Sequence, residues 1–426
     1  MDKISMWEAT ANQRRERPTL EGDQQCDVVI IGGGYSGLST SYFLQQKDVK
    51  TIVLEKDLVG SGASGRNGGE LLTGYMDSAS SLIKKKGIDV ARRMYQLSLD
   101  SIDLIETIIE SNDIDCAFTR KGSLKAAYRA SDIDGMKREQ EVLEREFNHK
   151  VKIVEPSEMQ TELKTTFYHG GRIDEKCGHF HPLNYALGLA DAVENFGGVI
   201  YENSEALRIE RDANNKVIVK TTSGRVFADE IVIVTNGYSG DLNKRIKRTI
   251  VPVESIMIAT EPMPEELMKD LIKNNRAVSD SKNLLYYFRR TADNRMAFGG
   301  SGRSTNKRDQ LLLFNQLQSG MTTVFPDLRE AKVEYQWSGK VGITKEKLPY
   351  MGRLEDGTYF AYGYAGHGAA LSTIMGQAIA RKIVAEDDVA NPLEVKRIRP
   401  IPFHSQHAKA VGLMKYYFRY EDKKKS

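Results

Sequence analysis

The chain has 426 residues, 40% of them hydrophobic and 28% charged, an ordinary globular composition that is long enough for two or three domain-sized cores. Its 61 basic and 58 acidic residues are interspersed and leave a net charge of +3, so the balance predicts no nucleic-acid partner. Cys26, Cys116 and Cys177 are widely spaced, which favours reduced thiols over a disulfide framework.

Two further features favour the cytoplasm. Residues 1–22 are polar and carry three arginines instead of the apolar core of a secretory signal. No run of residues is apolar and long enough to span a bilayer, so we expect no integral membrane segment.

The most informative feature is a strand, glycine turn and helix near the start of the chain. The β-branched run 28–31 is followed by Gly32-Gly33-Gly34-Tyr35-Ser36-Gly37 and a helix-like stretch at 38–46. In such a unit Gly32 makes the tight turn, Gly34 lets the backbone approach a pyrophosphate, and Gly37 lets the helix pack close to the strand. The N–H groups and positive end of the helix then form an anion site.

A carboxylate stands where a dinucleotide site needs one. A second β-branched run, 51–54, ends in Glu55, eighteen positions after Gly37. A carboxylate there accepts hydrogen bonds from both hydroxyls of an adenosine ribose and repels a 2′-phosphate, which disfavours NADP. The alternative is a packing turn followed by a solvated glutamate, which the strand–helix–strand context makes the less favoured interpretation.

The next segment, residues 60–69, contains too many glycines for an ordinary helix or strand. Small residues flank Arg66 and Asn67 on both sides. We interpret the segment as a backbone cradle around a flat or phosphorylated ligand; a flexible surface loop is the alternative.

The middle of the chain mixes helical and strand patterns. A charged stretch with helical apolar spacing covers residues 80–147, Pro182 begins a second helix that continues to about residue 196, and a third lies near 310–323. The strand patterns are residues 197–201, the hairpin 216–227, 231–234, 256–260, 284–290 and 295–298. The last three predict an antiparallel sheet with one solvated face.

Glycine becomes frequent again near the end of the chain. It is densest in residues 362–369, and a helix rich in small residues follows at about 370–385. This is a second strand, glycine turn and helix, whose helix N-terminus is suited to stabilise negative charge on a bound ring.

These motifs, which span residues 27–385, resemble the FAD-dependent amine and amino-acid oxidoreductases of the D-amino-acid oxidase (DAO) superfamily, which includes glycine oxidase and monomeric sarcosine oxidase. Within it the chain is most similar to the gamma-glutamylputrescine oxidase group, through residues 7–11 with Arg17-Pro18, 62–69 and 364–368. The resemblance implies an α/β fold with a Rossmann-like FAD-binding domain of the glutathione-reductase type. A second α+β substrate domain is built on an antiparallel sheet.

The resemblance also implies a discontinuous domain division. The FAD-binding domain takes residues 1–80, 176–242 and 331–392, the substrate domain takes 81–175 and 243–330, and 393–426 form a C-terminal arm.

The FAD-binding residues implied by the resemblance come from six segments. The pyrophosphate lies on the first glycine turn, the ribose on Glu55, and the ribityl chain and ring along the 60–69 segment. The adenine edge lies on residues 206–207, residues 235–237 close over the dinucleotide, and the ring lies at 366–368. The full set is Gly32, Gly34, Tyr35, Ser36, Gly37, Glu55, Lys56, Ser61, Gly62, Ala63, Ser64, Arg66, Asn67, Gly68, Gly69, Glu70, Ala206, Leu207, Thr235, Asn236, Gly237, Gly366, His367, Gly368 and Ala369.

The flavin is expected to be noncovalent. Some relatives attach it to a cysteine in the region matching residues 337–344, whereas this chain has no cysteine beyond Cys177.

The implied reaction is hydride transfer from the carbon next to an amine to flavin N5, giving an imine that water hydrolyses to an aldehyde or keto acid and ammonia or an amine. The protein must hold the amine neutral and stabilise the reduced flavin, for which the helix after Gly368 and His367 are suited. A packing role between glycines is the alternative for His367.

Three more residues are catalytic candidates: Lys340, Arg289 and Tyr287. Lys340 either activates oxygen or binds a carboxylate beside the ring, or it is simply solvated. At most one of Arg289 and Arg290 faces the pocket, and the period of two places Arg289 on the same side as Tyr287. Arg289 then anchors a substrate carboxylate, with a surface ion pair as the alternative.

Two other motifs are interpreted as structural. Residues 177–181 hold a cysteine and two histidines, but a second ligand cluster is missing and His181 directly precedes Pro182 at a helix start, so we expect no metal. The aromatic and basic tail, 415–420 with Lys423 to Lys425, is expected to be a packed arm with a frayed end, and contact with a membrane or partner is the alternative.

The sequence leaves the electron acceptor open. An amine oxidase that uses O2 is the main hypothesis, and a dehydrogenase that passes electrons to a quinone or a protein is its rival. A flavin-binding module without catalysis is an alternative of another class. The small amine substrate and the oligomeric state also stay undetermined.

Overall fold

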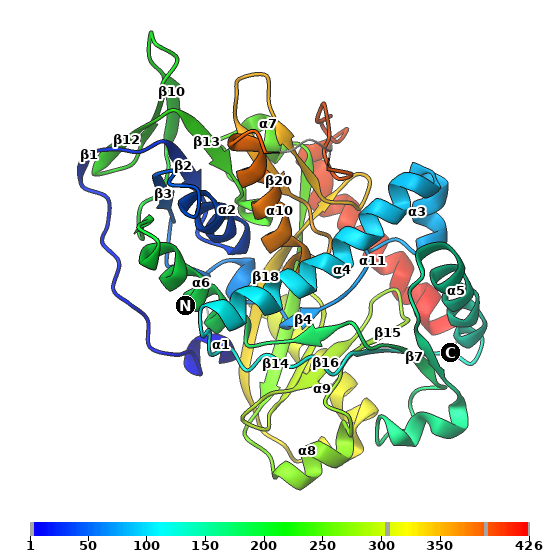
Figure 1. The fold of residues 1–426 in the computed structure, drawn as a ribbon. Helices are drawn as coiled ribbons and strands as arrows, with labels where there is room; N and C mark the ends of the chain where they lie inside the picture. Colours follow the sequence, from blue (N-terminus) through cyan, green and yellow to red (C-terminus); the bar gives the residue numbers. More distant parts are fainter. Residues whose placement is uncertain (1–3, 303–306, 387–390, 425–426) are drawn as a thin grey trace.

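The computed structural model describes residues 4–302, 307–386 and 391–424. Its upper half in Figure 1 is organised by a six-stranded sheet that contains the two predicted glycine units. The strand order is β19 (Tyr350–Arg353), β20 (Tyr359–Tyr362), β13 (Glu230–Ile233), β2 (Val28–Ile31), β3 (Thr51–Leu54) and β9 (Val199–Tyr201). All neighbours are parallel except β19 and β20.

Both faces of this sheet are covered, which explains why its strands are apolar throughout. Val28 and Ile30 face a core shared with α2 (Tyr35–Gln45), α6 (Pro182–Asn195) and α10 (Gly368–Ile383). Val29 and Ile31 face the other core. A four-stranded sheet covers that side, in the order β1 (Gly22–Gln25), β12 (Gly224–Ala228), β11 (Val217–Lys220) and β10 (Arg208–Arg211).

An eight-stranded sheet organises the lower half of Figure 1. Its order is β18 (Val333–Thr344), β14 (Ile250–Thr260), β17 (Met296–Ser301), β16 (Tyr287–Arg290), β15 (Ala277–Asp280), β5 (Ser123–Ala126), β7 (Gly171–Asp174) and β6 (Lys152–Val154). Only the β15–β5 pair is parallel. The predicted class, a Rossmann-like α/β unit joined to an antiparallel sheet, is therefore confirmed.

The two faces of the eight-stranded sheet have different neighbours. Ile256, Phe288 and Phe298 face a core with α8 (Glu265–Leu271) and α9 (Lys307–Val324). Residues one position along those strands, such as Met257 and Ala297, belong to the core of the nucleotide-binding half. The second face therefore looks toward the predicted flavin site.

Some sequence expectations need correction. The stretch 80–147 is not helical throughout, because β5 separates the long helix α4 (Ile88–Ser111), which crosses the middle of Figure 1, from α5 (Asp132–Phe147). Strand β18 pairs along its length with β14, although the predicted division assigns its residues to the FAD-binding domain. The domain boundaries stay a prediction.

The remaining elements are short or peripheral. They are α1 (Met6–Ala9), α3 (Ala79–Lys86), α7 (Lys244–Lys247), β4 (Glu70–Leu71), β8 (Gly178–His179) and α11 (His407–Lys424). The C-terminal helix α11 is tied down by Asp422, which accepts hydrogen bonds from the amides of Asn283 and Leu284 at 3.0 Å. Tyr416 and Tyr417 are exposed on it, and Lys425 lies outside the described residues.

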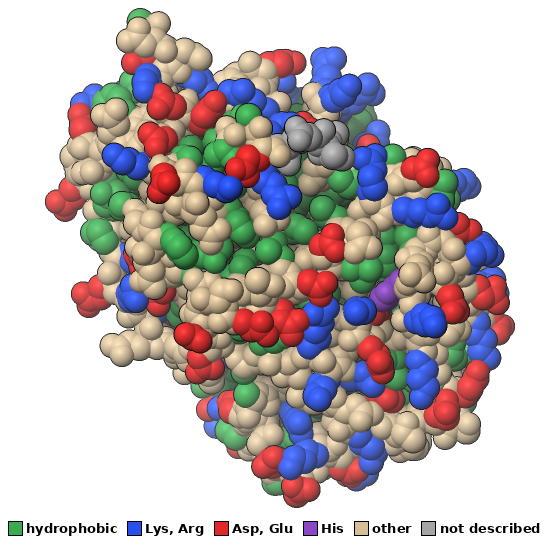
Figure 2. Space-filling view, in the orientation of Figure 1, with side chains coloured by type: hydrophobic (Ala, Val, Ile, Leu, Met, Phe, Trp, Pro, Cys, Tyr) green, Lys and Arg blue, Asp and Glu red, His purple; other side chains and the backbone are tan. Residues whose placement is uncertain are grey.

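Acidic and basic side chains are interspersed over the face seen in Figure 2. Across the three described stretches of the chain, we find no helix that combines the length and apolar character needed to cross a membrane.

Candidate functional site

The first glycine turn lies between β2 and α2 as predicted. Gly34 is the N-cap of α2 and has no side chain to cap that end; Ser64 takes only the Tyr35 amide, so further backbone N–H groups of the first turn remain available. A Cβ on Gly37 would collide with the carbonyl oxygen of Gly32, so only glycine lets the helix approach the turn. A Cβ on Gly34 would lie 2.8 Å from Ser64 Oγ.

Glu55 lies beside this turn at the end of β3. Its Oε2 accepts a hydrogen bond from the Gly33 amide at 2.7 Å, and its Oε1 accepts one from the Asp57 amide at 3.0 Å. Burial raises the pKa of Glu55, and these two amides oppose that shift. Lys56, its neighbour, is exposed and pairs with Glu205 at 3.3 Å.

The glycine-rich segment folds into a hydrogen-bonded loop instead of a flexible one. Asn67 Nδ2 donates to the carbonyl oxygens of Ala63 and Ser64, and Asn67 Oδ1 accepts from the Gly69 amide at 2.7 Å. Arg66 Nε donates to the Ser61 carbonyl oxygen at 2.9 Å. The loop thereby holds its own shape, while Ser64 Oγ accepts from the Tyr35 amide at 3.0 Å and joins it to α2.

Two tryptophans clamp the loop from outside. Trp7 Nε1 donates to the Asn67 carbonyl oxygen at 2.8 Å, and Trp337 Nε1 donates to that of Arg66 at 3.0 Å. The two indoles meet edge to face. Neither was among the predicted site residues; for Trp7 the only sequence signal was the resemblance of residues 7–11 to the subfamily.

Arg289 lies on the same side of the sheet as the loop, but it does not offer a free guanidinium. It is 3% exposed, and it donates to the carbonyl oxygens of Gly68 at 2.7 Å and Phe180 at 2.6 Å. Its remaining nitrogen contacts His179 Nδ1 and the Arg290 carbonyl oxygen. Because every nitrogen has a partner, the expected carboxylate anchor is corrected to a structural role: Arg289 holds the loop.

Tyr287 and Glu70 complete this part of the site. The ring of Tyr287 lies against Gly68, where a Cβ would be 3.0 Å from it, and its hydroxyl lies 2.9 Å from Ser255 Oγ. Glu70 Oε1 is buried without a hydrogen-bond partner. Burial raises the pKa of Glu70 to about 8, against the lowering effect of Arg289, so this carboxyl is largely protonated at neutral pH.

The second glycine turn comes to the same place. Tyr364 precedes it, and its hydroxyl lies 2.5 Å from Ser36 Oγ in α2. Gly366 has a φ of +98° and open space where a Cβ would be. His367 follows as the N-cap of α10; burial lowers its pKa to about 4, and its Nδ1 is buried without a hydrogen-bond partner. The imidazole is thus neutral, and positive potential comes from the helix end.

Two further predicted segments are residues 235–237 and residues 206–207. Thr235-Asn236-Gly237 forms a turn in which Asn236 Oδ1 accepts from the Gly363 amide at 2.9 Å, joining it to the second glycine turn. The Leu207 amide donates to the Lys220 carbonyl oxygen at 2.8 Å, and contact of residues 206–207 with an adenine stays a prediction.

Lys340 lies beside the predicted site residue Gly237, where an added Cβ would be 3.3 Å from the Lys340 Cβ. Gly339, its neighbour on β18, faces Arg66, and successive strand residues face opposite ways. The exposed Lys340 places its ammonium 5.2 Å from the centre of the Tyr238 ring. This geometry favours the exposed-lysine alternative, and a role of Lys340 beside the flavin stays a prediction.

The cysteine and histidine motif has structural duties. His181 Nδ1 accepts from the Asn184 amide at 3.1 Å and caps α6, while His179 Nε2 lies 2.9 Å from the Asn275 carbonyl oxygen. Burial lowers the pKa of His181 to about 4 and that of His179 to about 3. Cys177 is a buried free thiol.

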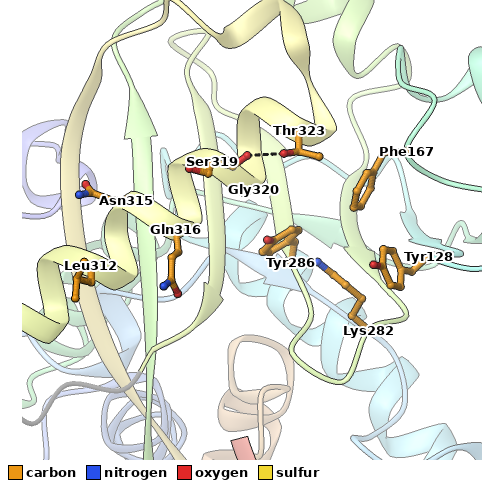
Figure 3. A pocket seen from close by; sticks show the side chains of 10 residues that line it. All are labelled: Tyr128, Phe167, Lys282, Tyr286, Leu312, Asn315, Gln316, Ser319, Gly320 and Thr323. Atoms are coloured by element: carbon orange, nitrogen blue, oxygen red, sulfur yellow. Dashed lines mark hydrogen bonds between the residues drawn. The ribbon is translucent and has the colours of Figure 1, made fainter. Parts of the chain in front are cut away.

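A separate cavity of about 450 Å³ lies away from this site, between α9 and the loop before β16. Figure 3 shows Lys282 extended toward Tyr286, with Tyr128 and Phe167 beside it. The ring of Tyr286 packs against the core on the α8 and α9 side of the sheet. This cavity therefore does not belong to the site built from the glycine turns.

The residues fit a bound dinucleotide with a flat ring. Free amides at the start of α2 suit a diphosphate, Glu55 suits a ribose, and the open position at Gly366 beside the unpartnered His367 Nδ1 suits the ring.

Comparison with known proteins agrees with this geometry. The DAO family profile, described as FAD dependent oxidoreductase, matches residues 27–382. A probable oxidoreductase OrdL of Haemophilus influenzae is 35% identical over 88% of this chain and 87% of its own length. A gamma-glutamylputrescine oxidoreductase of Escherichia coli is 33% identical over 88% of both chains.

The fold is also that of a solved relative. The crystal structure of glycine oxidase from Geobacillus kaustophilus aligns with a TM-score of 0.74 at 24% identity, covering 88% of this chain and 100% of that one. With these matches, the chain belongs to the DAO family of FAD-dependent oxidoreductases that act on amines or amino acids.

Proposed function

We propose that the enzyme oxidises a C–N bond of a gamma-glutamylputrescine-like amine and uses O2 as the acceptor, releasing hydrogen peroxide. The observation that carries the proposal is the convergence of both glycine turns and the 61–70 loop, joined by the Ser64–Tyr35 and Ser36–Tyr364 contacts. The name of the relative at 33% identity supports the substrate class.

In this proposal FAD supplies the hydride acceptor for the carbon that carries the amine, and water hydrolyses the resulting imine. The protein binds and orients. We assign the pyrophosphate to residues 32–37 and the ribose to Glu55, whose carboxylate keeps lone pairs beyond those used by Gly33 and Asp57.

The ring end of the site combines a helix terminus with uncharged side chains. The N-terminus of α10 stabilises negative charge, while His367 stays neutral because its pKa is about 4. The half-buried Tyr287 ring lies against Gly68. The protonated carboxyl of Glu70 is available as a hydrogen-bond donor at this site.

We propose that the flavin is bound without a covalent link and that the enzyme works in the cytoplasm. All three cysteines are buried and free. Burial raises the pKa of each thiol to about 12, so none forms the thiolate that attachment or oxidation needs. A yellow chromophore that precipitates with acid-denatured protein would contradict the noncovalent assignment.

The test has two steps. Purified protein, reconstituted with FAD, is mixed anaerobically with gamma-glutamylputrescine, N-methyl amino acids, glycine and taurine while flavin absorbance is followed. We expect the first compound to bleach the flavin fastest. Air is then admitted, and hydrogen peroxide is measured per amine consumed.

Each rival has its own outcome. Bleaching without a stoichiometric yield of peroxide supports a dehydrogenase with another acceptor. Bound flavin that no amine reduces supports a binding module and contradicts the proposed oxidation.

A further inference from the structure

Two cationic side chains stand opposite each other on the sheet that faces the proposed active site. Lys125 on β5 and Arg172 on β7 are register partners in an antiparallel pair. Directly opposed residues on such strands place their side chains on one face, with Cβ atoms about 5 Å apart.

The face on which they lie is fixed by their neighbours. Leu124, Ala126 and Ile173, which flank the two cations along the strands, belong to the core on the α8 and α9 side. Lys125 and Arg172 therefore project from the opposite face, toward the nucleotide-binding half.

The same row of the sheet leads to the flavin loop. Lys125 is paired with Ser279, and Ser279 is paired with Tyr287, whose ring lies against Gly68. Since strands are about 4.8 Å apart, Lys125 starts about 10 Å from Tyr287 along the row. The charge of Lys125 also contributes to the lowered pKa of His367, so its ammonium lies within electrostatic range of the second glycine turn.

Neither cation has a counterion within the part of the chain that the structure describes. Among the described residues, neither side chain forms a hydrogen bond or ion pair, and Arg172 Nε is buried without a partner. The Lys125 side chain is accessible to solvent, yet burial, followed by the repulsion from Arg172, lowers its pKa. The Lys125 ammonium therefore lies among protein atoms but stays accessible to solvent.

Nearby acidic groups do not neutralise the pair. Three carboxylates act on Lys125 only through space, and each already has another partner: Glu139 accepts from the Ala79 amide, Asp132 from Ser281 Oγ, and Asp280 pairs with Lys282. Two opposed like charges destabilise a sheet unless an anion bridges them. A planar carboxylate suits an arginine fork beside a lysine.

We propose that Lys125 and Arg172 form a subsite for a carboxylate carried by the amine substrate, separate from the C–N bond that is oxidised. This inference rests on the proposed function and names its substrate class: an elongated amine with a carboxylate at the far end. Arg289 cannot take this role, because its nitrogens are bound to backbone and side-chain acceptors.

The test compares a matched pair of amines on the FAD-loaded enzyme. Gamma-glutamylputrescine and N-acetylputrescine share the same oxidisable end, but only the first carries a carboxylate. We expect wild type to prefer the first, and Lys125→Gln and Arg172→Gln each to lower its kcat/KM about 10- to 100-fold while changing that of N-acetylputrescine less than about threefold. Arg172→Lys should recover part of the loss.

Lys121→Gln is the control for loss of positive charge, because Lys121 is exposed and lies two residues before β5. It should leave both amines unaffected. Flavin content and unfolding temperature, measured for every variant, separate a folding defect from loss of the subsite.

Binding keeps the inference testable if no amine is oxidised. Calorimetric titration of the holoenzyme with glutarate should show binding in wild type and a matching loss in both glutamine variants. Reduction of the flavin by both amines at equal rates, with selectivity unchanged in the variants, would overturn the subsite while leaving the oxidation intact. Absence of flavin reduction with glutarate binding that depends on Lys125 and Arg172 would overturn the oxidation alone.

Discussion

The cationic side chains at the two ends of one sheet face differ in their partners. At the β16 end, Arg289 donates to the Gly68 and Phe180 carbonyl oxygens at 2.7 and 2.6 Å. At the β5 and β7 end, Lys125 and Arg172 oppose each other, and neither has a counterion among the residues that the structure describes. Both ends face the same proposed active site. The difference separates a charge that builds the protein from charges that are available to a ligand.

The largest effect is expected from replacing Arg289 at the β16 end of the sheet. Arg289→Leu leaves two buried carbonyl oxygens without donors and frees the 68–69 backbone, at a cost of about 3 to 5 kcal/mol in the free energy of unfolding. We also expect loss of bound flavin, because the loop is no longer held. Thermal unfolding and flavin absorbance measure both effects.

Arg289→Lys is the matched control. It keeps the charge but loses the fork that reaches Gly68 and Phe180 together, so its stability should fall between those of wild type and the leucine variant. An unchanged free energy of unfolding in the leucine variant would show that Arg289 does not stabilise the fold.

The next effect concerns Glu70, whose pKa is about 8 beside Arg289. Its folded pKa lies above the unfolded value near 4.5, so the folded protein binds the extra proton and stability falls as pH rises from about 5 to about 8. Each unit of pKa elevation corresponds to about 1.4 kcal/mol.

Glu70→Gln removes this part of the pH dependence. In flavin-free protein the variant should therefore be increasingly more stable than wild type as pH rises through that range, with a constant difference above about pH 9. Unfolding temperatures measured from pH 5 to 9 test the difference between the two profiles. Parallel profiles would place the carboxyl in an ordinary, ionised state.

The local parts of the site are the ones that sequence patterns could predict. Gly32, Gly37 and Glu55 lie in a local strand, turn and helix unit, where spacing alone fixes which backbone atoms meet. The class of fold and the second glycine turn follow from the same local signals.

Residues that depend on long-range pairing could not be predicted in the same way. Lys125 and Arg172 are 47 positions apart in the sequence and become neighbours only through strand register. Because apolar residues around β5 follow helical spacing, the sequence analysis did not predict this strand. The short alternating segment after Gly122 was the available signal. Arg289 was placed on the correct face, but its partners Gly68 and Phe180 come from distant loops, so its structural role was invisible.

A smaller change in stability, of opposite sign, is expected at the β5 and β7 end of the sheet. Lys125→Met replaces an ammonium, opposed by Arg172 and disfavoured by burial, with an apolar side chain of similar length. We expect the free energy of unfolding to rise by about 0.5 to 1 kcal/mol in the absence of substrate. A loss of stability in denaturant titration would indicate that Lys125 has a structural partner.

The smallest effect sets the baseline for the comparison, because Lys340 is a cation on the same sheet that belongs to neither end. It is exposed, and its ammonium lies 5.2 Å from the centre of the Tyr238 ring, a contact worth about 0.5 kcal/mol at an exposed site. Lys340→Met should therefore change stability by no more than about that amount and leave both flavin reduction and its reoxidation by O2 within twofold of wild type. Stopped-flow traces of the two half-reactions measure this directly. A selective loss in reoxidation would mean that the charge of Lys340 acts on oxygen chemistry, and the division between structural and ligand-binding cations would then need a third class.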